Sequence, residues 1–270
     1  MSTMRKDKIL IKNPIEELAV FDGLIEILLR DHTTNQNIIW ASSDYPFDKT
    51  DPIRAEDVHL IIPHFMKSKD ARKRRKKLRA EVFTAPFICK LQNDLIDDGS
   101  LEPDEFLDAT MLEITCGEAP YLAGRYNVVD GSPIALDARV GLLDRKLRLV
   151  NQKVDNRNDW CNLARRAYQS IYGYEFQGDN LLLARCNLLL TAEDYYRAEF
   201  RDSLPQDFLK ELSDIISWNL WQFDGIKNTV PFQDNSTGLF NNCLIRDWQT
   251  RELVNFPSLN AVGTFSEDEF

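Results

Sequence analysis

The chain has 270 residues, of which 43% are hydrophobic and 10% aromatic, so it is long enough and apolar enough to bury a full core. It has no apolar run that could span a membrane and no apolar stretch of signal-peptide type behind its N-terminus, which argues against a membrane protein or a secreted one. Five scattered cysteines without Cys-x-x-Cys spacing indicate reduced thiols in a cytoplasmic protein without a metal site, and the net charge of −10 is unusual for a DNA-binding protein.

The N-terminal part is predicted to mix a helix with short strands. Apolar residues recur with a period near 3.6 over residues 10–30, which predicts one amphipathic helix. Pro14, directly after Asn13, suits the first turn of that helix. Short strands are predicted within Asn37–Tyr45 and at Asp57–Pro63.

A run of basic residues occupies positions 67–79, where nine basic residues stand against one acidic residue. The local charge is therefore +8, and the rest of the chain carries −18. Concentrated positive charge attracts the DNA backbone, because counterions are released where the protein replaces them. A solvated helix or a linker is the alternative interpretation. The residues expected to contact DNA are Arg72, Lys73, Arg74, Arg75, Lys76, Lys77 and Arg79.

An apolar segment from Ala109 to Ile114 predicts a strand, after which the chain turns at Cys116-Gly117. A sharp turn at a strand end favours a residue without a Cβ, which Gly117 provides. A ligand can then approach the backbone and the N-terminus of the element that follows.

A second strand is predicted at residues 171–175, ending in Glu175 and followed by an apolar helix. A carboxylate at a strand end can accept hydrogen bonds from the two hydroxyls of a ribose. In nucleotide-binding folds this acid commonly comes about 20 residues after the glycine turn, a spacing that Asp137 or Asp144 would meet. We prefer Glu175, because neither aspartate follows a predicted strand.

The remaining predicted elements are helices at 86–96, 139–149 and 156–168, a helix or strand at 209–223, and a hairpin at 244–256. Asp159 is the expected N-cap of the helix at 156–168. The segment at 209–223 leads to an acid, Asp224, and the turn of the hairpin is expected near Gln249-Thr250. An acidic tail ends the chain.

Three of these segments resemble motifs of S-adenosylmethionine-dependent DNA methyltransferases, especially the adenine-N6 class of restriction–modification systems. Glu113-Ile-Thr-Cys-Gly-Glu-Ala119 is similar to motif I, Asp-Pro-x-Cys-Gly-Ser-Gly. Gly173-Tyr-Glu175, with Ala184-Arg-Cys-Asn-Leu188, is similar to motif II. Ala80-Glu-Val-Phe-Thr-Ala-Pro86 resembles motif X, usually Gly-x-x-Phe-Thr-Pro. The three stand in the order of this class over residues 80–190.

The resemblance implies an α/β protein with a Rossmann-like, doubly wound sheet of the class I methyltransferase type, with helices on both faces. It divides the chain into an N-terminal helical or mixed extension with the basic segment (1–79), an S-adenosylmethionine-binding domain (80–240), and a C-terminal hairpin and acidic tail (241–270). It assigns Glu175 to the ribose, Phe176 to the adenine ring, and Asp224 either to the adenine amino group or to a simple turn. The implied cofactor-binding residues are Phe83, Thr84, Glu113, Thr115, Cys116, Gly117, Glu118, Ala119, Pro120, Glu175, Phe176 and Asp224.

The sequence differs from this methyltransferase class in the motif that holds the target amine. The tetrapeptide Asn/Asp-Pro-Pro-Tyr/Phe/Trp, which accepts hydrogen bonds from the exocyclic amine of a flipped base, occurs nowhere in the chain. In the part of the chain where this tetrapeptide is expected, the nearest segments are Thr229–Phe232 and Phe240–Cys243, and neither is a good replacement. In motif I, Glu118-Ala-Pro120 replaces the small residues of the class. Catalytic residues are therefore not assigned.

Two functions remain open. The first is an S-adenosylmethionine-dependent DNA methyltransferase acting on adenine amino groups, or the modification subunit of a restriction–modification system with a restriction or specificity subunit as partner. The alternative is a catalytically silent protein of methyltransferase fold that binds cofactor, DNA or a protein partner. The enzyme is favoured slightly, because methyl transfer depends mainly on positioning, which an unrecognised loop could provide.

Overall fold

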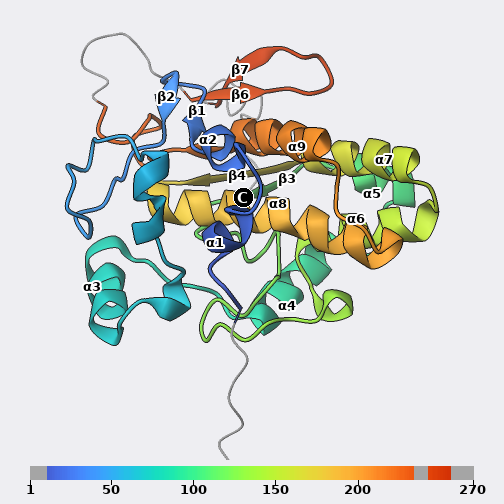
Figure 1. Cartoon of the computed structure of the whole chain (residues 1–270), viewed down its shortest axis with the longest axis horizontal. Coiled ribbons are helices and arrows are strands. Elements are labelled where there is room, and N and C mark those ends of the chain that lie inside the picture. The colour runs from blue at the N-terminus through green and yellow to red at the C-terminus, as the bar shows by residue number, and fades with distance from the viewer. Residues whose placement is uncertain (1–10, 234–242, 257–270) are drawn as a thin grey trace, which may run out of the picture.

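The structure, a computed structural model, describes residues 11–233 and 243–256 (Figure 1). The helices are α1 (Pro14–Leu18), α2 (Leu24–Leu28), α3 (Lys69–Arg79), α4 (Pro86–Ile96), α5 (Pro103–Asp108), α6 (Leu142–Lys153), α7 (Arg157–Gln169), α8 (Gly178–Phe200) and α9 (Gln206–Asn219). The 3-10 helices are η1 (Ala55–Leu60), η2 (His64–Met66) and η3 (Leu136–Ala138). The strands are β1 (Arg30–Asp31), β2 (Gln36–Asn37), β3 (Met111–Glu113), β4 (Ile171–Glu175), β5 (Leu220–Gln222), β6 (Leu244–Arg246) and β7 (Leu253–Asn255).

Three parallel strands form the central sheet in the order β3-β4-β5. Met111 of β3 pairs with Ile171 of β4. The strand before the Gly117 turn and the strand that ends in Glu175 are therefore adjacent and parallel, as predicted. The structure confirms an α/β fold with a small parallel sheet. These three strands follow one another in chain order, so the reversal of strand order that defines a doubly wound sheet does not occur among the described strands.

The two faces of this sheet are covered differently. Met111, Ile171 and Leu220 share the main core with helices α7, α8 and α9. The opposite face carries Tyr174 and Trp221, which pack against the β6–β7 hairpin in a separate cluster. Helices were predicted on both faces. In the described part of the chain the connections α7, α8 and α9 lie on one face, and the hairpin lies on the other.

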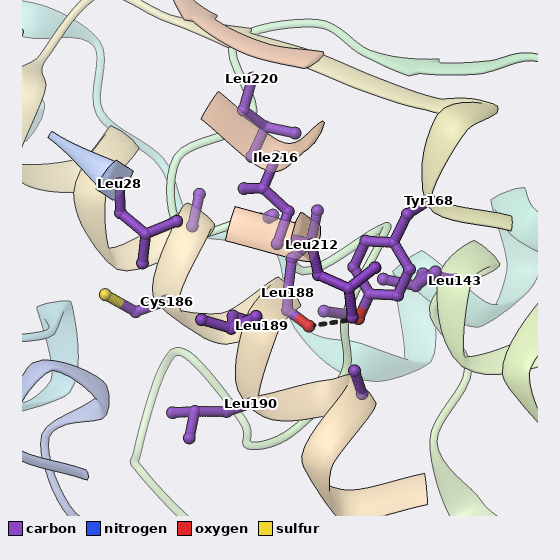
Figure 2. Close-up of a cluster of buried hydrophobic side chains, with 14 of the residues drawn as sticks. Leu28, Leu143, Tyr168, Cys186, Leu188, Leu189, Leu190, Leu212, Ile216 and Leu220 are labelled. Atoms are coloured by element: carbon purple, nitrogen blue, oxygen red, sulfur yellow. Dashed lines mark hydrogen bonds between the residues drawn. The ribbon is translucent and has the colours of Figure 1, made fainter. Parts of the chain in front are cut away.

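Helix α8 crosses the middle of the molecule and forms the centre of the core (Figure 1). Most of its length is buried on all sides, as expected for a helix that is apolar around its circumference. Figure 2 shows Leu188 and Leu189 near Leu212 of α9, and a hydrogen bond of 2.6 Å from the Tyr168 hydroxyl to the Leu188 carbonyl. Within residues 11–233 and 243–256, no helix is long and apolar enough to cross a membrane.

Residues 10–30 do not form the single helix that was predicted. Gly23 has φ = 73°, in the left-handed region that glycine tolerates, and it separates α1 from α2. The start of α1 agrees with the prediction, because Pro14 occupies the first turn and the Asn13 side chain accepts a hydrogen bond from the Ile15 N–H. The break lets α1 pack on α8 while α2 packs on α9.

Three smaller predictions also need correction. Asp57–Pro63 is not a strand: its first part lies in η1, whose three-residue turns bring Val58 and Ile61 toward the core. Of the segment Asn37–Tyr45, in which a strand was predicted, only Asn37 lies in a strand, as the last residue of β2, and Ile39 forms an isolated bridge with Pro52. The N-cap of α7 is Asn156 and not Asp159: the Asn156 side chain accepts from the Asp159 N–H at 2.9 Å, so Asp159 lies inside the first turn.

The other predicted elements within the described residues are present, and the acidic tail lies outside the described residues. Helices α4, α6 and α7 lie where the sequence indicated them. The segment at 209–223 contains both alternatives, because α9 runs directly into β5. The C-terminal hairpin pairs β6 with β7 in antiparallel fashion around Gln249-Thr250.

Arg185 of α8 is completely buried and joins three elements through backbone carbonyls. Its guanidinium donates to the carbonyl oxygens of Leu28, the last residue of α2, and of Arg30, the first residue of β1. It also donates to those of Ser217 and Leu220, where α9 passes into β5. Burial lowers the pKa of Arg185 to about 10, so the group stays charged at neutral pH. These contacts hold β5 and α2 against the central helix.

We expect the substitution Arg185→Met to destabilise the fold strongly, because it leaves four buried carbonyl groups without their donor. Each unpaired buried group costs about 1–3 kcal/mol, so the free energy of unfolding in urea should fall by at least about 3 kcal/mol. The control is Lys210→Met on the exposed side of α9, which should change it by less than about 0.5 kcal/mol. A loss below about 1 kcal/mol in Arg185→Met would contradict this role.

Candidate functional site

A cavity of about 530 Å³ opens at the carboxyl ends of β3 and β4. One wall is the turn after β3, a second is the end of β4, and a third is the segment from Leu78 to Thr84 between α3 and α4. Ligands of open α/β sheets bind at the carboxyl ends of the strands, and this volume lies in the range of small-molecule sites. The cavity is therefore the candidate site.

The turn after β3 has an unusual backbone. Thr115, Gly117 and Ala119 all have left-handed φ angles, of 50°, 55° and 61°. A Cβ on Gly117 would lie 3.3 Å from the ring of Phe83, so glycine allows this ring to close over the turn. The turn also directs the Gly117 N–H at Oε2 of Glu175, 2.9 Å away on the next strand.

Glu175 ends β4 at the base of the cavity. Its carboxylate accepts from the N–H of Gly117 through Oε2 and from that of Gln177 through Oε1, at 2.9 and 3.1 Å. Burial raises the pKa of Glu175 to about 7, although both backbone hydrogen bonds favour the charged form. The carboxyl is thus half ionised near neutral pH and would gain from a ligand that donates hydrogen bonds to it.

Glu113, at the end of β3, is a second buried carboxyl beside the cavity, with 8% of its surface exposed. Its Oε1 accepts a long hydrogen bond of 3.4 Å from the Tyr121 N–H, and its Oε2 has no hydrogen-bond partner among the described residues. Burial raises the pKa of Glu113 well above its ordinary value. A buried acceptor without a donor is costly, so this oxygen favours a ligand that carries a donor or a positive charge.

The segment over the cavity is held by Arg75, a basic residue of α3 with only 2% of its surface exposed. Its Nε donates to Oε2 of Glu81 at 2.7 Å. Its Nη1 lies 3.0 Å from Asp44 and 2.9 Å from Asp179, and its Nη2 donates to Gln177 at 2.7 Å. We call these five residues the Arg75 cluster. Glu81 and Gln177 of this cluster line the cavity.

The Arg75 cluster is charged at neutral pH despite its burial. Burial acts to raise the pKa of Asp179, but the charges of Lys67 and Arg75 hold it well below its usual range. Burial likewise opposes the ionisation of Glu81, while the His64 ring, 3.7 Å away, and the charge of Arg75 hold its pKa at about 2. The pairing therefore outweighs desolvation, as it can only where donors and acceptors match closely.

The structure brings most of the predicted cofactor residues to this one cavity. Those that line it are Phe83, Thr84, Glu113, Thr115, Cys116, Gly117, Pro120, Glu175 and Phe176. Nine further lining residues were not predicted to bind the cofactor: Leu78, Arg79, Ala80, Glu81, Val82, Ile114, Tyr121, Gln177 and Asn180. These residues lie in or within a few positions of the three motifs. That closeness could have indicated them as lining residues, because the residues next to a strand end remain near it in space.

Three predicted cofactor residues do not line the cavity. Glu118 is fully buried and turns inward, where Oε2 accepts from the Tyr126 hydroxyl at 2.7 Å. Ala119 is buried beside it in the core. Asp224 follows β5, as predicted, but its Oδ1 accepts from the N–H groups of Ile226 and Lys227, which is the geometry of a turn.

The residues predicted to contact DNA lie on α3, but they do not share one environment. Lys73, Lys76 and Lys77 are exposed, and Arg72 is half-buried. Arg74 forms an ion pair with Asp44 at 2.7 Å. Arg75 belongs to the interior cluster, and Arg79 donates to the Ala41 carbonyl at 2.7 Å. The basic run thus has an outer face of lysines and an inner face of arginines that anchor the helix.

Comparison of the chain with models of protein families, with curated proteins and with solved structures gives no match.

We expect Arg75→Met to destabilise the protein by about 3–5 kcal/mol, because it leaves buried carboxylates uncompensated. The matched control is Arg74→Met, which removes a partly exposed ion pair and should cost less than about 1 kcal/mol. Both are measured by urea denaturation at pH 7. Equal losses in the two variants would refute a structural role for the inner face of α3.

The same pair of variants tests the charge state of the cluster. The folded pKa of Glu81 lies below its ordinary value of 4.5, so its stabilising contribution is complete above that pH and is lost as the pH falls toward 2. The difference in stability between wild type and Arg75→Met should therefore shrink over this range.

Proposed function

We propose that the cavity binds S-adenosylmethionine and that the chain is an S-adenosylmethionine-dependent DNA methyltransferase, or the modification subunit of a restriction–modification system. The observation that carries this proposal is the meeting of three sequence motifs, spread over residues 80–190, around one cavity at the strand ends. The proposal includes a sheet of the Rossmann-like class I type, of which β3, β4 and β5 are the described part.

The residues of the cavity suit this cofactor. Glu175 has two oxygens at a strand end, where a ribose can donate both of its hydroxyls. Gly117 leaves room beside Phe83, and Phe176 offers a ring for adenine. The unpaired Oε2 of Glu113 suits the ammonium group of the methionine moiety. The bound cofactor would supply an electrophilic methyl group on its sulfonium.

DNA is the proposed second ligand, and adenine amino groups are the proposed acceptors. The exposed lysines of α3 lie on the same helix that anchors the segment over the cavity, so a duplex held there would lie close to the cofactor. Phosphate contacts of this kind position DNA but do not select a sequence. A restriction or specificity subunit is the proposed partner that selects it.

A second function has its own support. The chain lacks the tetrapeptide that holds a target amine, and Asp224 closes a turn instead of facing the cavity. A protein of this fold that binds cofactor, DNA or a protein partner without methyl transfer fits both facts. Incubation with labelled S-adenosylmethionine and varied DNA separates the two functions, because only the enzyme transfers label to DNA.

We expect Glu175→Gln to weaken S-adenosylmethionine binding at least tenfold at pH 8, because a neutral amide loses charge-assisted hydrogen bonds worth about 1.5–3 kcal/mol each. Wild-type affinity should rise about tenfold from pH 6 to pH 8, since the ionised fraction of a carboxyl with a pKa of about 7 rises from about one eleventh to about ten elevenths over that range. The affinity of Glu175→Gln should lack this rise.

The measurement is titration calorimetry at pH 6, 7 and 8. The control is Glu193→Gln, which changes a buried carboxyl of α8 outside the cavity and should bind like wild type. Absence of binding by the wild-type chain at every pH would remove the cofactor from the proposal.

If α3 holds DNA, log affinity should fall with log salt by about 0.9 per phosphate contact. Replacing Lys73, Lys76 and Lys77 by Ser should flatten that slope by up to about 2.7, with the same effect on unrelated duplexes. A control triple at Lys12, Lys49 and Lys210, exposed lysines elsewhere, should leave the slope unchanged. Fluorescence anisotropy on a short duplex measures both, and equal slopes for the two triples would make α3 an ordinary solvated helix.

A further inference from the structure

Glu118 follows Gly117 in the turn after β3 but faces the interior, away from the cavity. It is completely buried. Its Oε1 accepts a hydrogen bond of 2.5 Å from the His64 N–H, and its Oε2 accepts one of 2.7 Å from the Tyr126 hydroxyl. Both oxygens therefore have a donor within the protein, so this carboxyl needs no ligand.

The position of Glu118 is fixed by the backbone and by helix α8. Gly117 and Ala119, on either side of it, have left-handed φ angles of 55° and 61°, which direct the side chain between them inward. Asn187 of α8 donates to the Glu118 carbonyl at 3.1 Å and to the Tyr126 hydroxyl at 3.0 Å. The carboxyl is thus held at both its backbone and its side chain, and it can in turn hold another group in place.

That group is His64, the first residue of η2. The His64 ring packs on the ring of Phe83, with 4.1 Å between the ring centroids and 32° between the planes. Phe83 lines the cavity, and its ring closes over Gly117, where an added Cβ would lie 3.3 Å away. The chain of contacts from Glu118 through His64 to Phe83 therefore returns to the turn from which it starts.

The other contacts of η2 leave the placement of the His64 ring to Glu118 and Phe83. The Nδ1 of His64 has no hydrogen-bond partner among the described residues, and the nearest carboxylate oxygen, of Glu81, is 3.7 Å away. At the other end of η2, the Nζ of Lys67 pairs with Asp179 at 3.3 Å. Loss of the Glu118 carboxyl should therefore shift His64 while Lys67 keeps η2 attached to the protein.

We propose that Glu118 is a positioning residue, which holds the His64 N–H and thereby keeps the ring of Phe83 against Gly117 as a fixed wall of the cavity. A wall that is in place before the ligand arrives reduces the ordering cost of binding. Contact between this wall and S-adenosylmethionine rests on the proposed function, but the placement of the wall does not.

Amide hydrogen exchange on the ligand-free chain tests the placement. The Gly117 amide donates to Glu175 beneath the ring of Phe83, so its exchange reports on the wall. The amides of α8 report on global unfolding. We expect Glu118→Ala and His64→Ala each to speed Gly117 exchange at least about tenfold relative to α8. His64→Ala retains the N–H that Glu118 accepts and removes only the ring, so it tests the path through Phe83.

Two further variants are the controls. Glu118→Gln should keep the wild-type ratio of exchange rates, because its amide oxygen can still accept from the His64 N–H and its amide nitrogen can donate to the Tyr126 hydroxyl. Tyr126→Phe removes the other hydrogen bond of Glu118 and leaves His64 in place. It should therefore lower stability and speed the amides of Gly117 and α8 alike.

Three exchange results would overturn the proposal. Equal acceleration of all amides in Glu118→Ala would make Glu118 an ordinary core residue. Unchanged Gly117 exchange in His64→Ala would remove Phe83 from the path, and this variant decides the matter if Glu118→Ala does not fold. Selective acceleration of Gly117 in Tyr126→Phe would show that any loss around Glu118 has the same effect.

Calorimetry with S-adenosylmethionine reports the proposed function separately. If the wild type binds, Glu118→Ala and His64→Ala should bind at least about threefold more weakly, because part of each population lacks the preformed wall, and Tyr126→Phe should bind like wild type. Equal affinities in all four proteins would exclude contact between the wall and this ligand. Absence of binding by the wild type would remove the cofactor from the proposed function, while the exchange ratios still decide the placement of Phe83.

Discussion

The guanidinium of Arg75 is the point on which the candidate site depends. It lies within 3.0 Å of carboxylate oxygens from three separated segments, at Asp44, Glu81 and Asp179. A buried ion pair of ordinary geometry rarely repays the cost of desolvating its charges. This one can, because a planar guanidinium satisfies several acceptors at once, and Tyr45 and Lys67 add further donors to Asp179. Removing it would leave several negative charges together in the interior.

That interaction connects two features that look unrelated in the sequence. α3 is the most basic segment of the chain, and the segment that follows it forms a wall of the cavity. Arg75 and Arg79 turn inward and bind Gln177, which also lines the cavity, while the lysines of α3 turn outward. The helix therefore has a structural side and a side available to a polyanion. A ligand on the outer side and a ligand in the cavity would share one rigid support.

The sequence predicts the part of this arrangement that depends on local pattern. Strands at 111–113 and 171–175, the Gly117 turn and the helix at 86–96 each follow from residues close together in the chain. The predictions that fail concern features that depend on tertiary contacts. The apolar periodicity continues from residue 10 to residue 30, but α1 ends at Leu18 and a new helix begins after Gly23, which caps α2 with a left-handed φ. The number of charges in the basic run does not show that Arg75 is buried, because its burial depends on carboxylates that are distant in the chain. Alternating left-handed residues at 115, 117 and 119 likewise turn Glu118 inward, which spacing cannot reveal.

The two departures from the methyltransferase pattern have a common physical explanation. The motif that would hold a target amine is missing from the sequence, and strands on the far side of β3 are missing from the described sheet. A loop that holds an acceptor base must face the cofactor across the crevice, which requires chain on that side of β3. The same edge exposes Leu112 and Ile114, and apolar side chains on an open edge favour association.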